Sequence, residues 1–70
     1  MDITSYKVKA LRYPQEEYIL GSLVPVIDEG SFYRIDGTHI FDKFRIRSVE
    51  LTESGILLHM QDKDVLLIVE

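Results

Sequence analysis

The chain has 70 residues, of which 46% are hydrophobic and 29% are charged, a balance typical of a globular domain and not of a disordered segment. No stretch approaches the ~20 apolar residues of a membrane span, so we expect no membrane association. The net charge of −4 argues against nonspecific binding along nucleic acid, and zero cysteines exclude disulfides and thiolate metal sites. The missing cysteines and an N-terminus unlike a signal peptide predict a cytoplasmic protein.

The length predicts that residues 1–70 form a single small β domain. A chain of this size buries only about 60% of the surface that its unfolded form exposes, so association would add stability. Turn signals recur at short, regular intervals without a long helical pattern between them. This spacing predicts an all-β, mainly antiparallel fold, a barrel or sandwich of about five to six short strands.

Strands are expected where apolar or alternating runs lie between turn signals. Asp36-Gly37 is the strongest of these signals, because a type I′ hairpin turn needs positive φ at both central residues and glycine adopts it without strain. The last three strands are expected to form an antiparallel meander. The expected strands cover residues 4–11, 31–35, 38–41, 44–51, 56–60 and 65–69.

The segment at residues 14–20 favours either one short helical turn or a strand. Pro14 is tolerated in a first helical turn, and the acids that follow it suit the positive end of a helix dipole. A strand through residues 18–20 is the competing prediction. Residues 24–27 are expected to form an extended edge segment, because Pro25 cannot donate to a central ladder.

The strand expected at residues 44–51 changes its buried face halfway along. Its apolar residues occupy even positions first and odd positions later, namely Phe44, Ile46, Val49 and Leu51. One extra residue near Arg47-Ser48, a β-bulge, would keep all four inside. The alternative is a long strand that faces the core with one side at its start and the other side at its end. Both arrangements leave Arg45 and Arg47 in solvent or against a partner.

The last expected strand is apolar on both faces, with Leu67 on one face and Leu66 and Ile68 on the other. A strand with one solvated face would alternate apolar and polar residues. Either a helix or loop covers the outer face, or that face is a subunit interface in a homo-oligomer, most simply a dimer. The interface candidates are Leu57, Leu66, Leu67 and Ile68.

A second candidate surface combines aromatic and cationic side chains on three neighbouring strands. If these strands pair in order, rings that stack and cations that hold carboxylate or phosphate share one face. Cross-strand pairing with acids such as Glu50 or Asp36 would neutralise the cations instead, and in a chain with excess acid this is the stronger expectation. The candidate partner- or ligand-binding residues are Tyr33, Arg34, Lys43, Arg45 and Arg47.

Catalytic and metal-binding patterns are weak. The glycines stand singly, and the sequence has no Walker loop, dinucleotide fingerprint or G-x-S-x-G motif. Asp36, His39 and Asp42 cross an expected hairpin turn, so they need not converge on a metal, and His59 is expected at a surface or interface. We therefore predict no catalytic residue, no metal site and no cofactor.

Two function classes follow from these observations. The first is a non-enzymatic binding protein, an interaction module or inhibitor, that contacts a partner protein through the Arg/Tyr-bearing strand surface. The second is a binder of a phosphorylated small molecule, a nucleotide or single-stranded nucleic acid through the same cationic strand. Salt would separate them, because phosphate binding weakens steeply with ionic strength.

Overall fold

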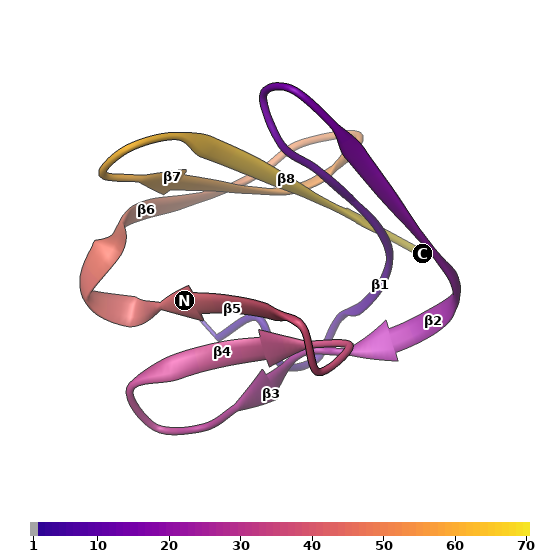
Figure 1. The fold of residues 1–70 in the computed structure, drawn as a ribbon, viewed down its shortest axis with the longest axis horizontal. Coiled ribbons are helices and arrows are strands. Elements are labelled where there is room, and N and C mark those ends of the chain that lie inside the picture. Colours follow the sequence, from indigo (N-terminus) through magenta and orange to yellow (C-terminus); the bar gives the residue numbers. More distant parts are fainter. Residues whose placement is uncertain (1) are drawn as a thin grey trace.

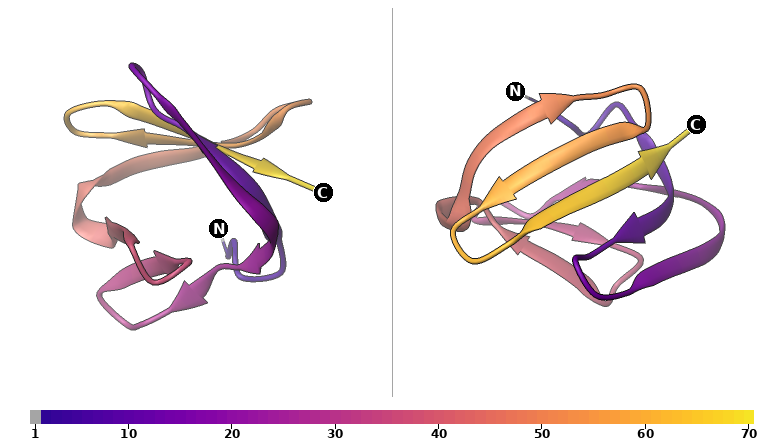
Figure 2. Two further views of the ribbon diagram at one scale, coloured as in Figure 1. Left: turned by 45° about the vertical axis from the view of Figure 1, so that its right-hand side comes forward. Right: turned by 90° about the horizontal axis from the view of Figure 1, so that it is seen from above.

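The computed structural model describes residues 2–70, which form two antiparallel sheets facing each other across one core (Figures 1 and 2). The larger sheet has the order β2-β1-β8-β7-β6, and the smaller has the order β3-β4-β5. The prediction of an all-β, mainly antiparallel fold is confirmed. The described residues form eight strands where about five to six were expected, because residues 17–25 and 27–28 are strands as well. The elements are β1 (Lys7–Arg12), β2 (Glu17–Pro25), β3 (Ile27–Asp28), β4 (Phe32–Ile35), β5 (His39–Asp42), the 3-10 turn η1 (Lys43–Arg45), β6 (Ile46–Leu51), β7 (Gly55–Met60) and β8 (Asp64–Val69).

Two connections join the sheets. On one side β2 runs into β3 through Val26, which is only 2% exposed, and on the other side η1 leads from β5 to β6 (Figure 1). Apolar side chains from both sheets fill the space between them. The core cluster contains Ile3, Val8, Leu11, Val26, Ile35, Phe41, Ile56, Leu58, Met60, Val65 and Leu67.

The expected C-terminal meander is confirmed, because β6, β7 and β8 are consecutive neighbours in the larger sheet. The hairpin turn at Asp36-Gly37 is present as well, but the loop also includes Thr38, so the next strand begins at His39 and not at residue 38. Ile35 pairs with His39, and both Asp36 (φ 56°) and Gly37 (φ 69°) have positive φ. Aspartate tolerates this left-handed conformation better than most residues, and glycine adopts it freely.

The expected β-bulge near Arg47-Ser48 is present. Ile46 pairs with Met60 and Ser48 with His59, so Arg47 is the extra residue on β6. The strand does not begin at residue 44, however, because the Asp42 carboxylate accepts a hydrogen bond from the Phe44 amide (2.9 Å) and caps η1. Ile46 and Val49 pack against the core, whereas Phe44 is 84% exposed and Leu51 is 53% exposed. The expectation that all four face inward is wrong for these two.

The helical turn considered at residues 14–20 is absent, and the competing strand is present. The Tyr13 amide donates to the Glu16 carbonyl (2.8 Å), and Arg12 pairs with Glu17 to open the β1–β2 hairpin. A helix of at most two turns is too short to be stable without packing, and the register with β1 supplies that packing to a strand. Pro25 lies on the edge strand of the larger sheet, as expected. In residues 2–70, no helix has the length and apolarity needed to cross a membrane.

Candidate functional site

The five residues of the predicted cationic surface come from three elements. Tyr33 and Arg34 lie on β4, Lys43 and Arg45 belong to η1, and Arg47 is the bulge residue of β6. Lys43, Arg45 and Arg47 therefore do not lie along one regular strand, because the 3-10 turn and the bulge change the direction of successive side chains.

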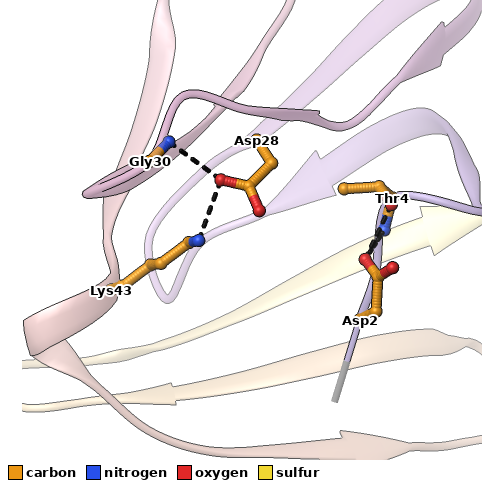
Figure 3. Close-up of polar contacts among 5 residues, drawn as sticks. All are labelled: Asp2, Thr4, Asp28, Gly30 and Lys43. Carbon is orange, nitrogen blue, oxygen red and sulfur yellow. Dashed lines mark hydrogen bonds and ion pairs between the residues drawn. The ribbon is translucent and has the colours of Figure 1, made fainter.

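Two of these cations are neutralised by acids next to or on β3. Arg34 Nε lies 2.8 Å from Glu29 Oε2, and Lys43 Nζ lies 2.8 Å from Asp28 Oδ1. Figure 3 shows the Asp28 carboxylate between the Lys43 ammonium and the Gly30 amide, which also donates to it at 2.9 Å. These two hydrogen bonds lower the pKa of Asp28, with Lys43 the larger cause, and Asp28 raises the pKa of Lys43. Cross-strand neutralisation thus occurs, with partners other than the expected Glu50 and Asp36.

Tyr33, Lys43 and Arg47 come together in one shallow depression, named here the β4–β6 depression. Its volume is about 360 Å³, and Lys43 Nζ lies 4.8 Å from the centroid of the Tyr33 ring. Arg47 forms no ion pair with any residue in the described part of the chain. Arg45 lines a different cavity, and Arg34 lines neither that cavity nor the β4–β6 depression. The depression is lined by Tyr33, Lys43, Ile46, Arg47, Ser48 and Val49.

A larger cavity, named here the aromatic pocket, lies where three hairpin turns meet. Its volume is about 910 Å³, and rings of Tyr13, Tyr18 and His39 line it. No local sequence pattern predicts this cavity, because Tyr13 and His39 are 26 residues apart in the chain. The only local signal is the pair of tyrosines flanking the β1–β2 turn in "YPQEEY". Among residues 2–70, no three His, Asp or Glu side chains are grouped to hold a metal ion.

The outer face of the larger sheet carries three of the four interface candidates. Leu57, Leu66 and Ile68 are half-buried there, whereas Leu67 is 0% exposed and belongs to the core. Leu67 therefore cannot contact a second subunit while the domain is folded. At the β2 edge of this face, Ile19 and Leu23 are 72% and 45% exposed. A cavity of about 480 Å³ there is lined mainly by Lys9, Ala10, Glu17, Ile19, Leu23 and Ile68.

His59 lies on the same outer face between two carboxylates. Its Nε2 is 2.9 Å from Glu50 Oε1, and its Nδ1 is 3.3 Å from Asp64 Oδ1. These contacts raise the pKa of His59, and the hydrogen bond to Glu50 is the largest cause. Glu50 lies on β6, His59 on β7 and Asp64 on β8. Protonated His59 therefore joins these three strands through two ion pairs.

We expect the free energy of unfolding to fall as the pH rises through the raised pKa of His59. The stabilisation of protonated His59 is fully present below the ordinary pKa of 6.5 and is lost above the folded-state pKa. Chemical denaturation of the wild type and His59→Gln between about pH 5 and about pH 9 measures this contribution. The wild type should lose more stability over that range than the variant. Parallel profiles would show that the two carboxylates do not stabilise the imidazolium.

No known protein family, curated protein or solved structure matches this chain. Inference about its function therefore depends on the side chains that gather on its surface.

Proposed function

We propose that the protein is a non-enzymatic interaction module or inhibitor that binds an acidic segment of a partner protein through the β4–β6 depression. The observation that carries the proposal is the convergence of Tyr33, Lys43 and Arg47 on that depression while Arg47 has no ion partner among the described residues. Arginine and tyrosine are enriched among the residues that dominate binding energy in protein interfaces.

The composition of the depression suits a carboxylate-bearing peptide. Arg47 can donate two parallel hydrogen bonds to one carboxylate, because the guanidinium group presents a planar fork. Ile46 and Val49 supply an apolar wall, and the Tyr33 ring supplies apolar area with a polar hydroxyl. Lys43 is already paired with Asp28, so Arg47 carries most of the available positive charge.

The second candidate is a small phosphorylated ligand in the same depression. Its volume of about 360 Å³ is within the range of small-molecule sites. A phosphate would engage Arg47 and Lys43 without using the apolar wall. Its affinity should therefore fall steeply with added salt, whereas that of a peptide anchored by apolar contacts should fall less.

Replacement of Arg47 by glutamate tests the proposal. The titrants are the peptide acetyl-Glu-Glu-Tyr-Glu-Glu-amide and, separately, inorganic pyrophosphate. We expect Arg47→Glu to weaken peptide binding by about 2 kcal/mol or more, because a desolvated charge pair becomes a repulsive one. Circular dichroism should remain unchanged, because Arg47 is exposed.

Two matched variants interpret that result. Lys7→Glu makes the same charge change at an exposed cation away from the depression, and Arg45→Glu makes it at a residue that lines another cavity. Both should bind nearly as the wild type does. Equal losses in all three variants would indicate nonspecific attraction and reject the depression as a site. Selective loss of pyrophosphate binding alone would favour the second candidate.

We also propose that the protein self-associates through the outer face of the larger sheet, as a dimer. Leu57, Leu66 and Ile68 give this face an apolar centre, and Ile19 and Leu23 extend it to the β2 edge. Sedimentation equilibrium at micromolar concentration should give twice the chain mass of 8.1 kDa. A single species at the chain mass would reject the dimer.

The predicted cytoplasmic location rests on composition and is tested by imaging a fluorescent fusion.

A further inference from the structure

The aromatic pocket is built by three hairpin turns that are distant in sequence. Residues 13–16 come from the β1–β2 turn, Asp36 and Thr38 from the β4–β5 turn, and residues 62–63 from the β7–β8 turn. Figure 2, right, shows the β1–β2 and β7–β8 turns along the same side of the molecule. The volume of about 910 Å³ is the largest of the cavities described above and is within the range of small-ligand sites.

The rings in the pocket hold one another in place. The Tyr13 hydroxyl and His39 Nδ1 are 3.0 Å apart, and the ring centroids of Tyr18 and His39 are 4.8 Å apart. Tyr13 and Tyr18 pack edge to face at 5.5 Å, and Tyr13 stacks on Phe41 of the core at 6.3 Å. The aromatic wall is therefore anchored to the core on one side and borders the pocket on the other.

The charges around the rings are mainly negative. Glu16, Asp36 and Asp62 line the pocket together with a single cation, Lys63. Lys63 pairs with Asp62 at 3.1 Å, whereas Glu16 and Asp36 form no ion pair with any residue in the range 2–70. Glu16 accepts a hydrogen bond from the Tyr18 hydroxyl, which fixes its carboxylate beside the ring.

We propose that the aromatic pocket binds an organic cation, a guanidinium or ammonium group, carried either by a small molecule or by an arginine or lysine side chain of a partner. Aromatic rings attract cations through their quadrupole, and the unpaired carboxylates add direct attraction. The same carboxylates repel phosphates and acidic peptides. The pocket is thus a second site, opposite in charge preference to the β4–β6 depression, and it stands whether or not that depression binds.

Titration with Nα-acetyl-L-argininamide, called argininamide below, tests the proposal when it is followed by NMR of the aromatic resonances. The guanidinium group is the only charge of this ligand. We expect saturable shifts at Tyr13, Tyr18 and His39 and none at Tyr33 in the β4–β6 depression. Nα-acetyl-L-citrullinamide, called citrullinamide below, has nearly the same shape and carries no charge, so it should bind about tenfold more weakly or not at all. Acetyl-Ala-Arg-Ala-amide is titrated in parallel. Saturation by argininamide assigns the site to small cations, and saturation by the peptide alone assigns it to a partner side chain.

Matched variants separate ring, charge and fold. Tyr18→Leu removes a ring that is 38% exposed and should weaken binding about tenfold, whereas Tyr18→Phe keeps the ring and should retain it. Asp36→Asn removes the charge with a residue that also tolerates positive φ, and it should weaken binding several-fold. Glu53→Gln changes an exposed carboxylate outside the pocket and should have no effect.

Three results would overturn the proposal. The first is the absence of saturable shifts with both argininamide and the arginine peptide. The second is equal binding of argininamide and citrullinamide, and the third is equal binding by the wild type and folded Asp36→Asn, because in both cases the charge would not be recognised. None of these results depends on the Arg47→Glu experiment, so the two sites succeed or fail separately.

Discussion

Replacement of Gly55 by alanine should unfold the protein or destabilise it by about 3 kcal/mol or more. Gly55 begins β7 with φ +150°, and a Cβ placed there would lie 2.0 Å from the backbone carbonyl oxygen of Leu67 on the adjacent strand. Backbone atoms of a central ladder cannot move aside without breaking the β7–β8 pairing. For a chain of this size, the expected loss is a large share of the total stability.

Gly37→Ala is the matched control for that experiment. Gly37 also has positive φ, +69°, but a Cβ there would meet no atom within 4 Å. Alanine in this left-handed conformation should cost about 1–2 kcal/mol from backbone strain alone. Urea denaturation followed by circular dichroism measures both variants. If Gly55→Ala proved no worse than Gly37→Ala, the close approach of β7 and β8 at Leu67 would be wrong.

Lysine at position 67 should unfold the protein, whereas lysine at position 66 should leave it folded. Leu67 is 0% exposed in the core, and a lysine there would bury an unpaired charge, at a cost of about 4 kcal/mol or more. Leu66 is only half-buried on the outer face of the larger sheet, where a lysine can extend to solvent. The two neighbours thus separate the core face of β8 from its outer face.

The same pair tests the proposed dimer. We expect folded Leu66→Lys to sediment as a monomer under conditions where the wild type is a dimer, because a charge at the centre of an apolar interface opposes association. Circular dichroism confirms folding, and sedimentation equilibrium gives the mass. A Leu66→Lys variant that remained dimeric would place the interface elsewhere on the surface.

The parts of the fold that the sequence predicted are those encoded by local patterns. Asp36-Gly37 defines a hairpin because few other residue pairs accept positive φ twice in succession. The bulge at Arg47 was predictable because the buried positions change parity on either side of it. The two faces of β8 were likewise visible, since core and outer-face residues alternate along it.

The errors in the predicted fold occur where neighbouring strands override local preference. Pro14 and the two glutamates after it favour a helix start, but pairing of Arg12 with Glu17 makes the segment a hairpin. The apolar side chain of Phe44 is in phase with that of Ile46, and this parity predicts that both face inward. The Asp42 carboxylate caps a 3-10 turn there instead, and Phe44 turns outward.

The candidate sites were harder to predict because they depend on residues far apart in the chain. The predicted surface required three strands to pair in order, but β6 pairs with β7 in the larger sheet and not with β5. Tyr33, Lys43 and Arg47 still line one depression. Residue type did not reveal that Asp28, 15 residues from Lys43, is the carboxylate that pairs with it. The aromatic pocket needs three turns to meet, and no local periodicity indicates which turns share one end of a two-sheet fold.

The pairing of β1 with β8 has a kinetic consequence. The hairpins β1–β2, β4–β5 and β7–β8 each close a short loop, so each can form quickly and independently. The β1–β8 ladder joins residues from opposite ends of the chain, such as Val8 and Val69, and its loop-closure entropy is lost before its contacts form. Completion of the larger sheet should therefore limit the folding rate, and until then the unpaired edges of β1 and β8 are open to pairing with other chains.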